Sequence, residues 1–122
     1  IVPGGRGARL VQRHNPAILD WIVAQNGQVD ILASVCTGVF LLAERGLLDG
    51  KRATTHWASI DLLRQQLPRT RVLSDVRYVD EGHILTSAGI SAGIDMSLHI
   101  VARLHGPEVA AWTARRMEYA VE

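Results

Sequence analysis

Cysteine is nearly absent from this chain, since the 122 residues contain only Cys36. A single cysteine excludes a scaffold of intramolecular disulfide bonds and favours a reducing compartment. The sequence also lacks any apolar run of the ~18–20 residues that a membrane-spanning helix requires. We therefore expect a cytoplasmic protein with no membrane partner.

Aromatic residues and net charge are also scarce. Phe, Trp and Tyr make up 5% of the chain, and the formal net charge is +1. A nearly balanced charge gives no strong attraction to polyanions, so nucleic acid is not an expected partner of this chain alone. Hydrophobic residues account for 48% of the sequence. That composition is typical of an α/β domain rich in Ala, Val and Leu, and the length allows one domain with a moderate core.

Metal-ligating patterns are missing as well. The five histidines show no ligand spacing, and a second cysteine that could pair with Cys36 does not exist. We expect neither a metal nor a cofactor. The arginines gather in two groups, 6–13 and 64–71, but Asp and Glu nearly balance them, which is typical of a solvated face.

The stretch from Val29 to Gly46 organises the chain. Residues 29–35 form a mostly apolar run that predicts a buried parallel strand, and residues 37–45 then favour a helix that Gly46 ends. Cys36 lies where the strand turns into the helix, and the small residue Gly38 follows it. An abrupt strand-to-helix turn needs small neighbours and presents its corner side chain at the carboxyl edge of the sheet, where open α/β sheets bind ligands.

Two interpretations of Cys36 stay open. A free cysteine is often a buried structural residue. A cysteine at a helix N-terminus is instead favoured as a thiolate, because the helix carries partial positive charge there. The strand-Cys-Thr-Gly-helix context favours the functional interpretation.

The remaining elements alternate between strands and helices. Asn15 and Pro16 predict the cap and first residue of a helix. The other expected elements are a strand at 51–56, a helix at 57–67, a strand at 72–79, a hairpin turn at 80–82 into a strand at 83–86, a helix with Ile94, Leu98 and Val101 on its core face, and a last helix from Pro107. Such alternation predicts a sheet with helices on both faces. The strands are too few for an open doubly wound sheet, and the first begins in mid-element, so we expect that an N-terminal part of the fold lies outside this chain.

Three further positions are candidates for a site with Cys36. His56 ends a strand that we expect beside the cysteine strand, where an imidazole could orient a thiolate or transfer protons. On spacing alone, a structural or solvated histidine is the favoured interpretation. The Thr37 amide, together with the Gly4–Gly5 loop, could form an oxyanion hole, although a plain turn is the default for a Gly-rich loop.

Four motifs together resemble a known family. They are Pro3-Gly4-Gly5, Ser34-Val35-Cys36-Thr37-Gly38, the run 46–57 from Gly-Leu-Leu-Asp-Gly-Lys to Thr-Thr-His-Trp, and the run 86–95 around Ser-Ala-Gly-Ile-Ser-Ala-Gly. In order and spacing they are similar to the ThiJ/PfpI superfamily, which is class I glutamine amidotransferase-like. Within it, the chain most resembles isocyanide hydratases and the ligand-like domain of AraC-type regulators. The resemblance implies a flavodoxin-like open sheet, a homodimer, and a ThiJ/PfpI-like domain over 1–122 that is the C-terminal two-thirds of the family fold.

The resemblance also implies roles for individual residues. Cys36 matches the family nucleophile, Thr37 and Gly5 match the positions of the oxyanion-site amides, and His56 matches a histidine near the cysteine in several members. Gly4, Gly5 and Gly38 are the expected oxyanion or substrate-binding positions, beside the expected catalytic residues Cys36, Thr37 and His56. Thr37 stands where the peptidase-like branch has histidine, so proteolysis is not expected. The acidic partner of the cysteine comes from the first strand-loop region of the family, which this sequence does not contain.

Three functions follow from these observations. The first is a cysteine-dependent hydratase or hydrolase of a small electrophilic substrate, resembling isocyanide hydratase. The second is a small-molecule-sensing domain of an AraC-type transcription regulator, and the third is a glyoxalase-type or oxidative-stress-response protein. For all three functions, we expect a small-molecule substrate or ligand at the Cys36 turn.

Overall fold

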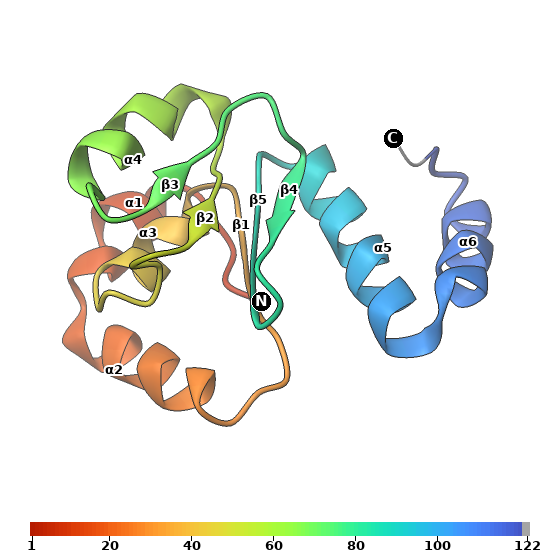
Figure 1. Ribbon diagram of the computed structural model, residues 1–122, viewed down its shortest axis with the longest axis horizontal. Coiled ribbons are helices and arrows are strands. Elements are labelled where there is room, and N and C mark those ends of the chain that lie inside the picture. Colours follow the sequence, from red (N-terminus) through yellow and green to blue (C-terminus); the bar gives the residue numbers. More distant parts are fainter. Residues whose placement is uncertain (121–122) are drawn as a thin grey trace.

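The computed structural model describes residues 1–120 and has a central sheet with helices on both faces, as the sequence predicts (Figure 1). The sheet has the strand order β1-β5-β4, with β1 at Leu32–Val35, β5 at Ile84–Ser87 and β4 at Tyr78–Asp80. β1 runs parallel to β5, and β4 runs antiparallel to β5. On the other side of β1, Val2 forms an isolated parallel bridge with Ser34.

The helices divide unequally between the two faces. They are α1 (Arg6–Leu10), α2 (Pro16–Asn26), α3 (Val39–Ala43), α4 (Ile60–Gln66), α5 (Ser91–His105) and α6 (Pro107–Arg116), with short 3-10 turns η1 (Gln12–His14), η2 (Cys36–Gly38) and η3 (Trp57–Ser59). Helices α1 to α4 lie on one side of the sheet and α5 on the other, while α6 packs against α5 away from the sheet (Figure 1). Within residues 1–120, no helix is both long and apolar enough to cross a membrane.

The larger hydrophobic core lies on the side of α2, α3 and α4. Phe40, Leu42, Leu48 and Leu63 are its fully buried large side chains. The smaller cluster, formed by Ala33, Leu85 and Met96, lies under α5. The buried strand β1 therefore has apolar neighbours on both faces, which explains why its sequence is an apolar run and does not alternate.

Local signals at helix ends are confirmed. The Asn15 side-chain oxygen accepts a hydrogen bond from the Ala17 amide at 3.1 Å, and Pro16 opens α2. Gly46 has the predicted left-handed conformation, with φ at 74°, which costs glycine little. The helix expected over 37–45 is shorter, since α3 ends at Ala43 before Gly46 is reached. These signals depend on residues close in sequence, so they can be recognised without the fold.

The strand expected at 51–56 is shorter in the structure. A second sheet pairs β2 (Arg52–Ala53) in parallel with β3 (Arg71–Val72). Beyond Ala53 the chain leaves this pairing, because the Thr54 amide donates to Thr86 Oγ1 at 3.0 Å and the Thr54 hydroxyl donates to the Leu73 carbonyl at 2.8 Å. Thr54 thus connects the small sheet to β5.

The prediction of a single strand at 72–79 is wrong. The chain has two strands there, because β3 ends at Val72 in the small sheet and β4 begins at Tyr78 in the central sheet. Asp75 between them has φ at 59°, which breaks the extended conformation. The predicted hairpin turn is confirmed, since β4 and β5 pair antiparallel around Gly82, whose φ is 88°.

The core face expected for α5 needs correction. Ala92, Asp95 and Met96 are buried along with Leu98, whereas Ile94 and Val101 are only partly buried and line a hollow shared with α6. The helix has two packing partners, the sheet and α6. The apolar stripe at helical spacing is therefore divided between them, and a polar residue, Asp95, lies on the buried side.

Candidate active site

Cys36 lies at the turn between β1 and α3, as the sequence predicts. Val35 is still extended with φ at −114°, and Cys36 then has φ at +55°. A non-glycine residue in this region is uncommon and costs free energy, which the surrounding contacts must offset. The cysteine is free and partly exposed. Its side chain is therefore held at a fixed corner of the backbone and remains accessible.

Gly4 and Gly38 allow the first loop to lie directly against this turn. A Cβ atom added to Gly4 would be 2.7 Å from the Thr37 nitrogen and 2.9 Å from Cys36 Cβ. A Cβ on Gly38 would collide with the carbonyl oxygen of Val2 and lie 2.8 Å from that of Pro3. Two hydrogen bonds hold the loop there: the Val2 amide to the Ala33 carbonyl at 2.8 Å, and the Val35 amide to the Val2 carbonyl at 3.0 Å.

Thr37 joins the loop to the turn through its side chain. Its hydroxyl oxygen accepts from the Gly5 amide at 2.9 Å and lies 3.4 Å from the Gly5 carbonyl, to which it donates. Thr37 is buried and Gly5 has φ at 124°. The predicted pair of residues is therefore brought together, but the Gly5 amide donates to the Thr37 hydroxyl and is not free for an oxyanion in this conformation.

Thr55 supports the cysteine in a way that the sequence analysis missed. Its hydroxyl donates to the Cys36 carbonyl at 2.9 Å, and the residue is only 1% exposed. A bond to this carbonyl helps to hold the unusual backbone conformation of Cys36. The signal in the sequence was two adjacent threonines beside a candidate site residue, but spacing alone does not reveal which carbonyl a hydroxyl reaches.

His56 lies near the same edge of the sheet, at the start of η3. Its Nδ1 accepts from the Ala58 amide at 3.2 Å, so Nε2 is the nitrogen that carries the proton in the neutral ring. The ring lies against the backbone of Gly89, where an added Cβ would be 2.6 Å from His56 Cδ2. In the described part of the chain, no hydrogen bond joins His56 to Cys36.

A surface hollow of about 450 Å³ opens beside His56. It is lined by Trp57, Val76, Gly89 and Ile90 among others, and Trp57 and Ile90 are each more than four-fifths exposed. Residues 88–90 follow β5, the neighbour of the cysteine strand. The hollow therefore lies toward the carboxyl end of β5, but Cys36, where the ligand was expected, is not among its lining residues.

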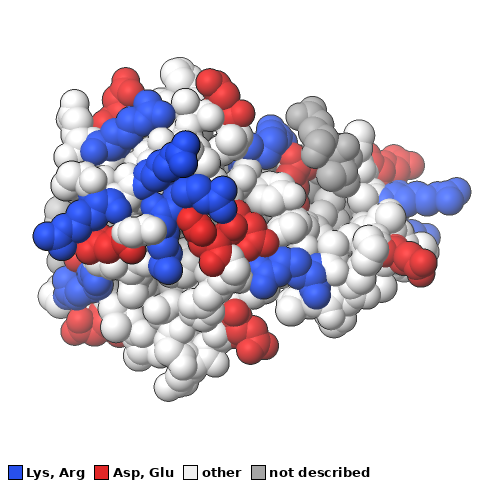
Figure 2. All heavy atoms as spheres, in the orientation of Figure 1, with Lys and Arg blue, Asp and Glu red and all other residues white. Residues whose placement is uncertain are grey.

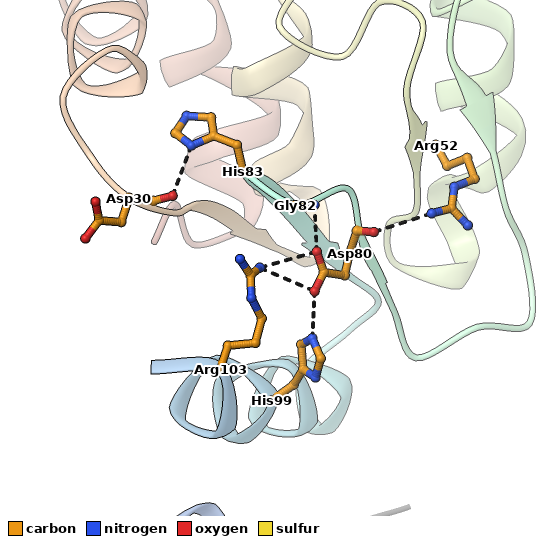
Figure 3. A network of polar contacts seen from close by, with 7 residues as sticks. All are labelled: Asp30, Arg52, Asp80, Gly82, His83, His99 and Arg103. Carbon is orange, nitrogen blue, oxygen red and sulfur yellow. Dashed lines mark hydrogen bonds and ion pairs between the residues drawn. The ribbon is translucent and has the colours of Figure 1, made fainter. Parts of the chain in front are cut away.

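A separate polar network surrounds Asp80, the last residue of β4 (Figure 3). Its carboxylate accepts from His99 Nε2 at 2.8 Å, from the Gly82 amide at 2.7 Å and from Arg103 at 3.3 Å. Burial alone would raise the pKa of Asp80, but the hydrogen bonds from His99 and Gly82 and the charge of Arg103 outweigh burial, so this pKa lies below its ordinary value. The network fastens α5 to the β4–β5 hairpin.

Charged side chains of both signs alternate over the face shown in Figure 2. Arg13 pairs with Glu44 at 2.7 Å, and Arg69 lies 3.9 Å from Asp49. Arg69 is solvated as predicted, whereas the Arg13 side chain is mostly covered and lies over the Phe40 ring, so the prediction of a solvated face holds for only part of the arginines. Among residues 1–120, no group of three or more His, Cys, Asp and Glu side chains is arranged to hold a metal ion.

Comparison with known proteins gives consistent matches. The DJ-1/PfpI family matches residues 1–103. Isonitrile hydratase of Pseudomonas putida is 42% identical over 119 residues, which are 98% of this chain and 50% of that protein. The HTH-type transcriptional regulator CdhR of Pseudomonas aeruginosa is 40% identical over 95 residues, which are 78% of this chain and 28% of the regulator. The chain thus spans half or less of the length of these relatives.

A solved structure has the same fold. A ThiJ/PfpI family protein from Pseudomonas syringae superposes with a TM-score of 0.85 at 27% identity, covering 100% of this chain and 51% of that one. The arrangement of sheet, turn and helices described above is therefore shared with a protein about twice as long.

Proposed function

Because the chain belongs to the DJ-1/PfpI family, we propose that it carries the nucleophile of a cysteine-dependent hydratase that acts on a small electrophilic molecule, with an isonitrile as the substrate. The observation that carries this proposal is the Cys36 turn, with φ at +55° and the Gly4 loop packed against it. The 42% identity to isonitrile hydratase over nearly the whole chain supports the choice of substrate.

The proposed reaction has two steps. The Cys36 thiol adds to the terminal carbon of the isonitrile: sulfur bonds to that carbon, the thiol proton moves to the same carbon, and a thioimidate forms. Water then adds to the thioimidate carbon with a proton going to nitrogen, and the C–S bond breaks to release an N-substituted formamide and the thiol. No electron acceptor is needed, because water is the only co-reactant.

The neighbours of Cys36 have separate parts in this proposal. The Thr37 amide stabilises charge that develops beside the sulfur, and the Thr37 hydroxyl keeps the Gly4–Gly5 loop in place. His56, with Nδ1 accepting from a backbone amide, presents Nε2 for proton transfer through water. Trp57 and Ile90 line the hollow in which we place the substituent of the isonitrile.

The test measures N-benzylformamide formed from benzyl isocyanide. We expect Cys36→Ala to lower the rate by more than about 10³-fold, since removal of a nucleophile leaves only binding and polar contacts. Thr37→Val keeps the shape but removes the hydroxyl, and should lower the rate roughly 10–100-fold because the loop is misplaced. Thr113→Val on α6, whose hydroxyl donates to the Val109 carbonyl of the same helix at 2.7 Å, is the matched control and should leave the rate unchanged.

Wild-type protein that forms no more formamide than Cys36→Ala would overturn the proposal. Methylglyoxal is assayed in the same samples, and its Cys36-dependent consumption in place of isonitrile turnover would favour a glyoxalase-type activity. The formamide and methylglyoxal assays use the same purified proteins, so a variant that fails to fold would lose activity in both assays.

The similarity to CdhR favours a second candidate, a ligand-sensing domain of a transcription regulator. In that case a small molecule binds at the hollow beside His56 and is released unchanged. The discriminating measurement is thermal stabilisation by candidate ligands in wild-type and Cys36→Ala proteins. Stabilisation that survives in Cys36→Ala, without product, would favour the sensor, whereas covalent adducts on Cys36 would favour the hydratase.

A further inference from the structure

The segment after α6 is fastened to the start of α5 by a tyrosine. Figure 1 shows this segment running back from α6 toward the first turn of α5. The Tyr119 hydroxyl donates to the carbonyl of Ser91, the first residue of α5, at 3.0 Å. Partial burial raises the pKa of Tyr119, and hydrogen bonding to the Asp95 carboxylate raises it further. The hydroxyl therefore keeps its proton at neutral pH and remains a donor.

The first turn of α5 is also held from the side of the sheet. Arg77, which precedes β4, donates to Ser91 Oγ at 3.2 Å and to Asp95 Oδ2 at 2.7 Å. The Arg77 carbonyl accepts from the Ala88 amide at 2.9 Å, just before this turn. Two parts of the chain that are far apart in sequence thus converge on Ser91. The bond from Tyr119 is the one that can be removed without disturbing the buried ion pair.

Ile90 depends on this turn for its position. The residue precedes Ser91 and has φ at 33° and ψ at −86°, a conformation that a β-branched residue rarely adopts. It is 82% exposed, so packing of its side chain does little to fix it. Such a conformation persists only where neighbouring contacts determine it. The hydrogen bonds to Ser91 supply those contacts on one side of Ile90.

Ile90 and Ser91 both line the hollow beside His56, whereas Tyr119 does not. We propose that Tyr119 is a positioning residue of this hollow: by holding Ser91, it keeps the Ile90 side chain where the apolar body of a ligand contacts it. The proposal rests on the proposed function, which takes the hollow as the site of the isonitrile substituent. Tyr119 acts on binding alone, because the Cys36 turn is held by other contacts, those of Gly4, Gly38 and Thr55.

The experiment uses Tyr119→Phe, which removes the hydroxyl and keeps the ring. N-Benzylformamide, the product of the proposed reaction, is titrated into ¹⁵N-labelled protein, and its Kd is taken from the amide shifts of residues 89–92. We expect Tyr119→Phe to raise this Kd about three- to tenfold, because the net contribution of a neutral hydrogen bond is of that size. Tyr78→Phe is the matched control and should bind as the wild type does, since Tyr78 is the other tyrosine of the chain and does not line the hollow.

Kinetics separate positioning from a general loss of structure. With benzyl isocyanide, Tyr119→Phe should raise KM by the same factor as Kd and leave kcat within about twofold of the wild type. A protein that is merely destabilised would contain fewer active molecules, so its apparent kcat would fall while KM stayed the same.

Ile90→Ala tests whether Tyr119 acts through Ile90. Truncation removes the side chain that Tyr119 is proposed to position, so Ile90→Ala should itself raise the Kd. In that background Tyr119→Phe should raise it no further, because two residues that act through one contact are not additive.

The positioning role is overturned if the formamide does not bind the wild type, if Tyr119→Phe binds it as Tyr78→Phe does, if kcat falls while KM and Kd stay the same, or if the Tyr119 and Ile90 changes act additively. A Kd that responds to Tyr119→Phe, in a protein whose wild type forms no formamide from the isonitrile, would overturn the proposed function and leave the positioning role standing.

Discussion

The Cys36 turn and the α5–α6 helix pair both flank the central sheet, but they are built in opposite ways. At the turn, backbone lies directly on backbone, and neither Gly4 nor Gly38 has room for a Cβ atom. Between the helices, three alanines leave a cavity of about 330 Å³. A strained corner needs contacts on all sides to hold it, whereas a cavity remains where the side chains are too small to fill the space between two helices.

Gly38→Ala should give the largest effect. Its Cβ would meet two backbone carbonyl oxygens, which cannot rotate away, so we expect a loss of about 3–4 kcal/mol in the free energy of unfolding. Gly7→Ala, at a helical position with no other atoms nearby, is the control and should be neutral or stabilising. Urea denaturation measures both, and equal stabilities would show that the turn is not closely packed.

Met96→Ala tests the inner face of α5. Met96 is 0% exposed and contacts the sheet, so we expect a loss of about 2–3 kcal/mol, at the low end for such changes because α5 can shift into the space. Met117→Ala, at a residue 49% exposed, should cost less than about 0.5 kcal/mol. The same denaturation experiment applies. A Met96→Ala cost as large as that of Gly38→Ala would remove the contrast between the two regions.

Thr55→Val should loosen the turn without emptying the core. Loss of the hydrogen bond to the Cys36 carbonyl leaves a buried acceptor unpaired, at an expected cost of about 1–2 kcal/mol. The rate of Cys36 alkylation by iodoacetamide should change as well, because the backbone of the turn is less fixed. Thr113→Val serves again as the control. An unchanged alkylation rate in Thr55→Val would mean that the glycine contacts alone hold the cysteine.

Removal of the Asp80 carboxylate should change the free energy of unfolding least, and the size of that change should depend on pH. The folded-state pKa of Asp80 is lowered, so its stabilisation is present above the ordinary value of 3.8 and is lost as the pH falls through the lower folded value. Asp80→Asn should therefore be less stable than wild type at pH 6, by under about 1 kcal/mol because the group is partly exposed. The difference should disappear toward pH 2.

Urea denaturation from pH 6 to pH 2 follows this convergence. Asp61→Asn, at a side chain that is 94% exposed, is the control and should track the wild type throughout. A stability difference between wild type and Asp80→Asn that grows as the pH falls would contradict the assignment of Asp80 as the group that titrates.

Local sequence signals predicted much of the fold. The cap at Asn15, the left-handed Gly46, the hairpin at Gly82 and the strand-to-helix turn at Cys36 all depend on a few neighbouring residues, and all are present. The errors lie where tertiary contacts decide. Thr54 leaves β2 because its partners are Thr86 and Leu73, and the predicted strand at 72–79 divides between two sheets.

For the candidate site, too, the residues marked by local sequence signals were predicted and those placed by tertiary contacts were not. Cys36, Thr37 and the Gly4–Gly5 loop were chosen from sequence and lie together, while their proposed roles stay predictions. Thr55 was missed as a support because a hydroxyl can bond many carbonyls, and only the fold brings the Cys36 carbonyl within 2.9 Å.

The sequence by itself determined that Cys36 stands at a tight strand-to-helix turn, because the apolar run before it, the helix after it and the small residues around it are all local. Only the tertiary structure decided what surrounds that turn and which face of α5 is buried. Asp95 lies on the buried face because Arg77, eighteen positions earlier, pairs with it there. Periodicity measures the apolarity of a helix face, but it cannot report a partner that the fold supplies from elsewhere.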